Sequence, residues 1–384
     1  MSFDDLDIAE LRRRRGKKWS TYGPDVLPAW IADMDFPVAP AIQRRLQEVL
    51  DHGDLGYPED AQAGRLKELL VRRCEERFGW SVAPARLEPI IDVVQGLQMC
   101  LEMFTHPGEG AAMLSPIYPP FLSTTRSMGR RTDCHRLMPG AGGFEIDWDR
   151  LESTIAADTR LLLLCNPHNP TGRVFTRDEL TQLAELASRH ELIVISDEIH
   201  SDLVFDGHTH IPFASLGPEI EERSITLLSS SKAFNIAGLR GAMMVFGSDR
   251  LHAAYRAGPR FIRGGMSSLG MHATEVAWSE CDEWLAALMA YLQLNRDLIQ
   301  RFLESQLPDI HFLPPQATYL AWLDCRSLGL GDGLWQTVLD KGKLALGDGR
   351  DFGPGGEECL RLNFATSKDL LRQALERLRR AVAA

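Results

Sequence analysis

The chain has 384 residues, of which 44% are hydrophobic, so it can bury a large core, and we expect two domains of unequal size. Its formal net charge of −11 argues against a nucleic-acid partner. We therefore interpret the basic run at residues 12–18 as a solvated surface. The seven cysteines are scattered and include no Cys-x-x-Cys pair, which predicts reduced thiols in the cytoplasm. The start of the sequence is acidic and has no apolar leader, so we expect no signal peptide. The apolar runs are only as long as strands, so we expect no membrane span.

A buried strand followed by a proline-rich loop is predicted in the middle of the chain. Residues 160–165 form a short continuous apolar run, which is typical of a strand buried on both faces. The run ends at Asn-Pro-His-Asn-Pro-Thr-Gly (166–172), where two X-Pro steps exclude a helix. Thr176 and Glu179 then match a capping box, and the apolar spacing that follows predicts a helix to about His190.

A second apolar run at residues 192–196 completes a strand, helix, strand unit, whose two strands must be parallel. It leads directly into Asp197 and His200, and a later apolar run leads into the Ser-Ser-Ser-Lys segment that ends at Lys232. Open α/β sheets bind ligands at the carboxyl ends of their strands. We therefore expect Asn169, Asp197, His200 and Lys232 to share one site.

These residue types match the needs of pyridoxal 5′-phosphate (PLP) chemistry. The amine of Lys232 could form an imine with the aldehyde, and buried Asp197 would gain a charged partner in a protonated ring nitrogen. Asn169 would donate to the ring oxygen. The phosphate would be held by Ser229, Ser231 and Arg240.

A metal site is a competing interpretation, because His-x-His spacing occurs in such sites. The candidate ligands are His200, His208 and His210 with Asp197 and Asp202. Spacing sets no third ligand and Asp197 has a better use, so we expect no metal. Taken singly, Tyr118 could be a packed loop aromatic and Arg361 a strand residue paired with a surface carboxylate.

Near the end of the chain, Thr366 and Asp369 match a second capping pattern. The apolar residues that follow at helical spacing predict a last helix with one apolar face. These apolar residues are Leu370, Leu371, Ala374, Leu375 and Leu378.

Nine ordered segments carry a resemblance over nearly the whole chain: 27–37, 56–58, 93–97, 115–121, 165–172, 196–202, 231–239, 317–322 and 361–365. In these segments the chain resembles the fold-type I PLP enzymes of the class I/II aminotransferase group. Within that group it is similar to the MalY/PatB-type cystathionine β-lyases. The resemblance implies an α/β fold with a large PLP-binding domain at residues 46–285, built on a mostly parallel sheet. Residues 1–45 and 286–384 would form a smaller α/β domain.

The resemblance also implies roles at matching positions. Lys232 would hold the cofactor and shuttle a proton, and Tyr118 would stack on the cofactor ring. His200 stands where many aminotransferases have a tyrosine, which favours the lyase branch. The substrate side would be formed by Arg361, which grips the α-carboxylate, together with Ala32 and Asn169. Tyr57 would reach the cofactor phosphate of the neighbouring subunit, which implies a homodimer with shared active sites.

One departure from the family pattern lies at residues 92–96, where related enzymes often have more glycine or a proline in the phosphate-binding turn. The backbone amides of Val93, Val94 and Gln95 would serve here, since amides at a helix N-terminus bind phosphate whatever their side chains. Asp92 would be unfavourable beside a phosphate unless it points away or bonds the turn, and the sequence leaves its role open.

The predicted function is a β-lyase that cleaves L-cystathionine or a related cysteine S-conjugate to a thiol, pyruvate and ammonia. An aminotransferase acting on a small amino-acid substrate would use the same residues, and a regulatory protein that keeps the cofactor only structurally is a third interpretation. The pocket around the substrate's Cβ, which Trp30, Asp33 and Tyr319 would shape, separates lyase from aminotransferase. The sequence alone leaves that choice open.

Overall fold

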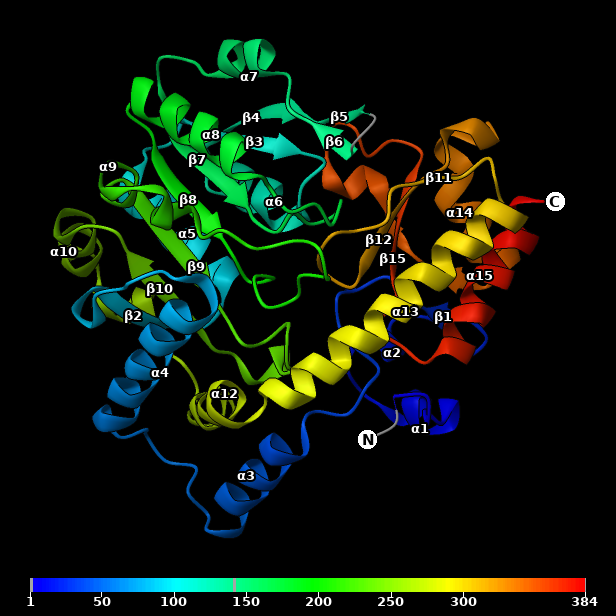
Figure 1. The fold of residues 1–384 in the computed structure, drawn as a ribbon, viewed down its shortest axis with the longest axis horizontal. Helices are drawn as coiled ribbons and strands as arrows, with labels where there is room; N and C mark the ends of the chain where they lie inside the picture. The colour runs from blue at the N-terminus through cyan, green and yellow to red at the C-terminus, as the bar shows by residue number, and fades with distance from the viewer. Residues whose placement is uncertain (1–2, 141–142, 384) are drawn as a thin grey trace.

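A seven-stranded sheet lies at the centre of the fold in the computed structural model, which describes residues 3–140 and 143–383 (Figure 1). The strand order is β2-β10-β9-β8-β7-β3-β4. β10 is antiparallel to both of its neighbours, and the other adjacent pairs are parallel. The strands are β2 (Leu87–Ile90), β3 (Gly110–Ser115), β4 (Arg131–Arg136), β7 (Thr159–Cys165), β8 (Ile193–Asp197), β9 (Ser224–Leu228) and β10 (Ala242–Phe246).

The strand, helix, strand unit predicted from the sequence is confirmed. β7 and β8 pair in parallel, and Cys165 lies opposite Asp197 at their carboxyl ends. The helix between them, α8 (Arg177–Arg189), begins with both hydrogen bonds of the predicted capping box of Thr176 and Glu179.

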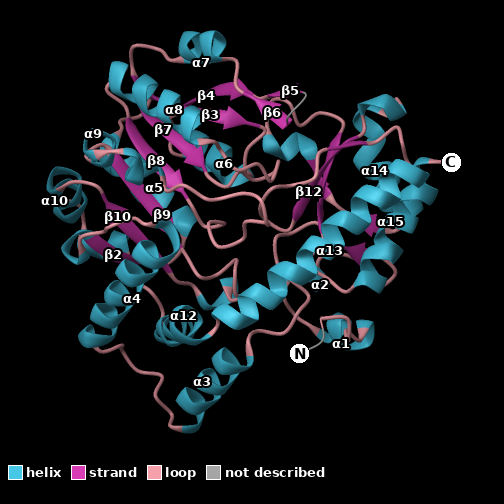
Figure 2. Cartoon of the chain, viewed as in Figure 1, coloured by secondary structure: helices cyan, strands magenta, loops and turns pink. Residues whose placement is uncertain are grey.

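Both faces of the central sheet are covered, as continuous apolar strands require. Leu161 and Leu163 of β7 pack in one buried cluster with residues of α5 and α10, whereas Leu162 and Leu164 pack on the other face with residues of α8. Figure 2 shows the helices around the magenta strands. The helices are α1 (Ile8–Arg13), α2 (Lys17–Ser20), α3 (Pro40–Asp51), α4 (Asp60–Phe78), α5 (Val93–Phe104), α6 (Pro119–Ser127), α7 (Trp148–Thr154), α9 (Pro218–Glu221), α10 (Asp249–Ala257), α11 (Arg260–Arg263), α12 (Ser268–Glu280), α13 (Asp282–Gln306), α14 (Leu334–Gly342) and α15 (Lys368–Val382).

A second, four-stranded antiparallel sheet has the order β11-β12-β15-β14 and lies on the other side of the molecule in Figure 1. Its strands are β11 (His311–Phe312), β12 (Leu320–Asp324), β14 (Gly347–Asp348) and β15 (Cys359–Asn363). Two further two-stranded sheets pair β1 (Leu27–Pro28) with β13 (Leu344–Ala345) and β5 (Met138–Gly140) with β6 (Gly143–Glu145). The predicted domain limits at residues 45/46 and 285/286 fall inside α3 and α13, and this division stays a prediction.

The last helix begins one residue later than the capping pattern predicts. Ser367, not Thr366, is the cap of α15, and its hydroxyl accepts a hydrogen bond from the backbone N–H of Leu370. Thr366 is buried, and its carbonyl oxygen accepts a hydrogen bond from the Asn295 side chain at 2.8 Å. The predicted apolar face of the helix is buried.

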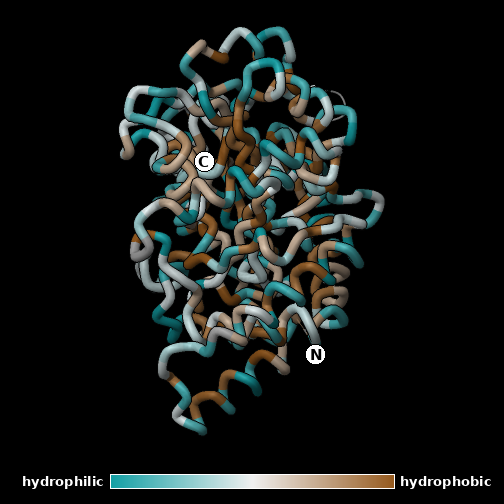
Figure 3. The backbone as a smooth tube through the Cα atoms, turned by 90° about the vertical axis from the view of Figure 1, so that its left-hand side faces the viewer, coloured by the Kyte–Doolittle hydropathy of each residue, from teal (hydrophilic) through white to brown (hydrophobic). Residues whose placement is uncertain are grey.

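Hydrophobic stretches of the backbone gather in the interior of the molecule, as the brown segments in Figure 3 show. Among the described helices, none combines the length and the apolar character needed to cross a lipid bilayer. All seven cysteines are free thiols, and every one except Cys134 is buried.

Candidate active site

The carboxyl ends of β7, β8 and β9 open on one cavity of about 150 Å³. Most of the predicted site residues line it: Ala32, Val93, Val94, Tyr118, Asn169, Asp197, His200, Ser231, Lys232 and Arg240. Four predicted residues are not part of its lining: Tyr57, Gln95, Ser229 and Arg361. The topology therefore brings together side chains from distant parts of the sequence, as the parallel strand order requires.

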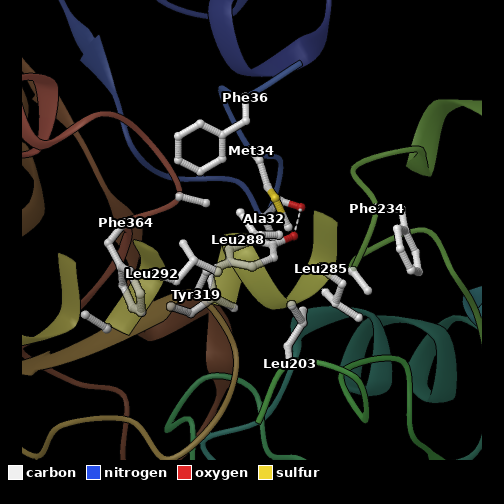
Figure 4. Close-up of a cluster of buried hydrophobic side chains, with 14 of the residues drawn as sticks. Ala32, Met34, Phe36, Leu203, Phe234, Leu285, Leu288, Leu292, Tyr319 and Phe364 are labelled. Carbon is white, nitrogen blue, oxygen red and sulfur yellow. Dashed lines mark hydrogen bonds between the residues drawn. The ribbon is translucent and has the colours of Figure 1, made fainter. Parts of the chain in front are cut away.

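Lys232 projects into the cavity from the turn that follows β9. Its Nζ donates a hydrogen bond to the carbonyl oxygen of Ala32 at 2.8 Å, and the Tyr319 hydroxyl donates to the same oxygen at 3.0 Å. Figure 4 shows Ala32 and Tyr319 beside each other in the buried cluster. Burial lowers the pKa of Lys232, Arg361 lowers it further, and Asp33 and Asp197 oppose the shift. A lowered pKa leaves more of the amine uncharged, which is the nucleophilic form.

The hydroxyl of Ser229 holds the turn that carries Lys232. It accepts a hydrogen bond from the backbone N–H of Ser231 at 3.1 Å and donates to the carbonyl oxygen of Gly241 at 2.6 Å. The Oγ atoms of Ser229 and Ser231 are 2.8 Å apart, and of the two serines only Ser231 lines the cavity. Both serines stay predicted phosphate ligands.

Ala32 belongs to an irregular segment, residues 29–36, that we call the strap. Asn363 Nδ2 donates to the carbonyl oxygens of Ile31 and Asp33 at 2.7 and 2.6 Å. Lys18, whose Nζ pairs with Asp35 at 2.9 Å, also donates to Asp33 O at 3.0 Å. The strap is thus held by Lys18 near the N-terminus and by Asn363 near the C-terminus. These contacts also fix the carbonyl oxygen of Ala32, which accepts the hydrogen bond from Lys232.

Asp197 ends β8 and is 3% exposed. Its Oδ1 accepts a hydrogen bond from the backbone N–H of Ile199 at 3.1 Å. Burial raises the pKa of Asp197 to about 7 and the charge of Glu198 adds to this, whereas the Ile199 hydrogen bond and Lys232 lower it. A buried carboxylate of this kind favours a cationic partner inside the cavity.

Arg361 lies on β15 and reaches a residue of the cavity lining. Its Nη1 donates to Asn169 Oδ1 at 3.0 Å, its Nη2 donates to the carbonyl oxygen of Trp30 at 2.8 Å, and its guanidinium stands 4.7 Å from the Phe352 ring. It is 6% exposed, so a pair with a surface carboxylate is excluded. Burial lowers the pKa of Arg361 to about 10. Its buried Nε has no hydrogen-bond partner among the described residues.

Asp92 is the N-cap of α5 and lines the cavity. Its Oδ1 accepts the backbone N–H of Gln95 at 2.8 Å, and its Oδ2 pairs with Nη1 of Arg240. The Gln95 amide is therefore already bonded. The amides of Val93 and Val94 are those that the helix N-terminus offers to an anion in the cavity.

Two aromatic groups flank the cavity. Burial raises the pKa of Tyr118 to about 12, so its hydroxyl stays protonated. His200 is 2% exposed, and burial together with Lys232 and Arg361 lowers its pKa to about 3, which keeps the ring neutral. Tyr57, by contrast, is fully exposed and belongs to the connection between α3 and α4. This connection lies at the lower edge of Figure 1.

His208 and His210, which form the His-x-His pair, are not part of the cavity lining. His208 is exposed, and Nε2 of His210 bonds the Glu198 carboxylate at 2.8 Å. Over residues 3–140 and 143–383, no group of three or more potential ligands could hold a metal ion.

Five cavity residues were not among the predicted ligands: Asp92, Cys165, Ile199, Ala237 and Gly241. Cys165 ends β7 and Ile199 lies two residues beyond β8, so strand position alone could have identified them. Ala237 and Gly241 lie on either side of Arg240 in the return that follows Lys232, and neither has a functional group that could have given a chemical signal.

His168 anchors the loop that carries Asn169. It is 0% exposed, and its Nδ1 lies 2.8 Å from Thr171 Oγ1. Burial lowers the pKa of His168 to about 3, and the positive charge of Arg173 contributes to this shift. The unfolded chain protonates this histidine near pH 6.5 and the native chain does not, so the native state loses stability as the pH falls from about 6.5 towards 3.

We expect His168→Gln to reduce the pH slope of the unfolding free energy by about 1.4 kcal/mol per pH unit between pH 6 and 4. Urea unfolding at several pH values measures this, and equal slopes in the two proteins would rule it out.

Comparisons with known proteins agree with this geometry. The family model "Aminotransferase class I and II" matches residues 62–378. Cystathionine beta-lyase PatB of Bacillus subtilis is 37% identical, with 100% of both chains covered, and the cystathionine beta-lyase of Corynebacterium glutamicum is 34% identical over 98% of this chain and 99% of its own. The solved structure of the PLP-bound C-S lyase of Staphylococcus hominis superposes with a TM-score of 0.92, at 28% identity, over 100% of this chain and 99% of that one. Both the fold class and the family predicted from the sequence are confirmed, and the chain belongs to the class I and II aminotransferase family, in its branch of cystathionine β-lyases.

Proposed function

We propose that this protein is a PLP-dependent carbon-sulfur β-lyase that cleaves L-cystathionine or a related cysteine S-conjugate to a thiol, pyruvate and ammonia. The observation that carries the proposal is its similarity, over the full length, to proteins named cystathionine beta-lyase. The cavity supplies the chemistry that such a reaction needs.

The residues present fit PLP. Asp197 is a buried acid with a raised pKa, which suits a protonated ring nitrogen. Lys232 supplies an amine with a lowered pKa for the aldehyde carbon. Arg240 and the N-terminus of α5 supply donors for a phosphate. Tyr118 supplies a ring face. When bound, PLP acts as the electron sink that stabilises negative charge at the substrate's Cα.

The protein groups would divide the work around it. Lys232 holds the cofactor and then takes the proton from Cα, for which its lowered pKa suits it. Asp197 keeps the ring nitrogen protonated, and Asn169 donates to the ring oxygen. Arg361 would bind the substrate carboxylate. Its buried Nε, which has no partner among the described residues, and its bond to Asn169 support that task.

An aminotransferase is the second candidate, because the family bears that name and the same residues would serve it. Neutral His200 beside Lys232, where many aminotransferases have a tyrosine, favours the lyase. The decisive experiment measures thiol and pyruvate release from L-cystathionine by cofactor-loaded protein without a keto acid. Repeated turnover would support the lyase. Turnover that appears only with a keto acid and an amino donor would identify an aminotransferase.

We also propose a homodimer with shared active sites, working in the cytoplasm. Tyr57 is fully exposed, Leu55 on the same connection is 58% exposed, and Leu50 near the end of α3 is 50% exposed, so this part of the chain presents apolar side chains to a partner. Tyr57 of the partner subunit would then reach the cofactor phosphate. The free thiols fit a reducing compartment. Sedimentation at several protein concentrations tests the dimer.

Asp92 should weaken cofactor binding, because its charge competes with the phosphate for Arg240. We expect Asp92→Asn, which keeps the helix cap but removes the charge, to bind PLP roughly threefold to tenfold more tightly. Asp147 caps α7 in the same way and lies outside the cavity lining, so Asp147→Asn is the matched control and should leave the affinity unchanged. Titration of the apoprotein with PLP measures both. Weaker binding by Asp92→Asn would show instead that Asp92 is needed to place Arg240.

A further inference from the structure

The carboxylate that follows Asp197 in the chain is fully buried and has no task in the proposed chemistry. Glu198 is 0% exposed. Its Oε1 accepts hydrogen bonds from Ser196 Oγ at 2.8 Å and from the backbone N–H of Phe213 at 2.9 Å, and its Oε2 lies 2.8 Å from Nε2 of His210. Oε1 therefore acts only as an acceptor, and the charge state of Glu198 depends on whether Nε2 of His210 donates to Oε2.

The second ring nitrogen of His210 decides the direction of this bond. If Nε2 carries no proton, or if both ring nitrogens carry one, Nδ1 is a buried N–H; if only Nε2 carries a proton, Nδ1 is a free lone pair. That nitrogen, Nδ1, has no hydrogen-bond partner among the described residues, and the ring packs edge-on against Phe78 at 5.1 Å. A buried N–H without an acceptor is rarer in proteins than an unsatisfied acceptor. The proton of the bond therefore lies on Nε2, which donates to Glu198, and a carboxylate that accepts three hydrogen bonds and donates none carries a negative charge one residue from Asp197.

The groups around the two carboxylates come from several elements. Lys232, Tyr118 and Cys165 interact electrostatically with Asp197. Burial raises the pKa of the Cys74 thiol of α4, and the charges of Glu198 and Asp202 raise it further, whereas Arg73 lowers it. Lys232 lowers the pKa of Asp197, whereas the charge of Glu198 raises it. A nearby negative charge favours the bound proton at any site that it faces.

The position of Glu198 is also fixed mechanically. Its backbone N–H donates to the carbonyl oxygen of Leu227 in β9, and its side chain accepts the backbone N–H of Phe213, 15 positions later in the chain. These two contacts fix the place of the carboxylate beside the carboxyl end of β8.

We propose that Glu198 is a positioning residue for Asp197, and that its buried charge keeps a proton on the pair formed by Asp197 and the cofactor's ring nitrogen. His210 holds the carboxylate in place. This inference rests on the proposed function, since it requires the ring nitrogen to lie opposite Asp197.

The test is the ¹⁵N chemical shift of the ring nitrogen, recorded against pH in holoenzyme loaded with ¹⁵N-labelled PLP and free of substrate. In Glu198→Gln, which keeps the shape of the side chain, we expect the nitrogen to lose its proton about one pH unit lower than in the wild type. His210→Lys places a permanent cation on Glu198 and should shift the transition in the same direction. His210→Gln replaces one neutral donor by another and should leave it unchanged.

The outcomes are distinct. An unchanged transition in Glu198→Gln overturns the inference, and so does an equal shift in all three variants, which would point to loop position instead of charge. If Glu198→Gln does not fold, the contrast between His210→Lys and His210→Gln decides alone. A ring nitrogen that is unprotonated in the wild type at every pH would instead overturn the proposed place of Asp197, and the proposed function with it.

Discussion

Replacement of Lys232 by alanine should abolish turnover while the protein stays folded. The variant loses both the amine that holds the cofactor and the base that takes the Cα proton, and we expect a fall in kcat of roughly 10⁴-fold or more. The structural cost is small, because the substitution removes a single hydrogen bond to the carbonyl oxygen of Ala32, and Tyr319 still bonds that oxygen. Steady-state kinetics and thermal unfolding of the two proteins measure activity and fold separately.

Two further variants sharpen this experiment. Lys232→Arg keeps a positive charge at the position but cannot form the linkage to the aldehyde, so it should be as inactive as the alanine variant. Lys67→Ala makes the same substitution on α4, outside the cavity lining, and should keep full activity. More than about one per cent residual turnover in Lys232→Ala is incompatible with the proposed role.

Asp197→Asn should have the next largest effect. An amide cannot balance the charge of a protonated ring nitrogen, so the electron sink weakens, and we expect kcat to fall roughly 10²- to 10³-fold. The fold should persist, because asparagine can still accept the N–H of Ile199. Stopped-flow absorbance of the cofactor together with steady-state kinetics would follow the effect.

Asp202 offers the matched control on the same loop. It is a buried carboxylate as well, but Arg73 bonds it at 2.9 Å and Arg77 at 3.1 Å, outside the cavity. Asp202→Asn should therefore lower the free energy of unfolding and leave kcat within a few-fold of the wild type. Kinetics in Asp197→Asn that match those of Asp202→Asn would show that Asp197 does not act on the cofactor.

Local sequence signals predicted the centre of the fold and the edge at which the site lies. The apolar runs that became β7 and β8, and the capping box of Thr176, depend on neighbours within a few residues. Once two strands of a parallel sheet are known, the position of the residues that follow them is fixed by topology. Asn169, Asp197 and Lys232 could be placed for this reason.

Competition for hydrogen bonds could not be predicted in the same way. Gln95 and Ser229 are predicted phosphate ligands, and in the structure the Gln95 amide donates to Asp92 and the Ser229 hydroxyl donates to the carbonyl oxygen of Gly241. The choice of Ser367 over Thr366 as the cap of α15 belongs to the same class, because two adjacent hydroxyl residues can each cap a helix.

Contacts between distant segments had no local signal at all. Arg361 reaches Asn169 across 192 positions of the chain, and Asn363 reaches Ile31 across 332. Only the assembled fold determines that the strap passes beside Lys232. The family resemblance supplied the substrate side of the site, which residue patterns alone did not.

The most direct test of the proposed function is to locate the cofactor on the chain. Holoenzyme treated with borohydride, which makes the lysine–cofactor linkage permanent, is digested and its peptides are analysed by mass spectrometry. We predict the added mass of the reduced cofactor on the peptide that contains Lys232, and its absence from Lys232→Arg treated in the same way. Modification of a different lysine, such as Lys18 or Lys343, or no modification of protein that is saturated with PLP, would contradict the role of Lys232.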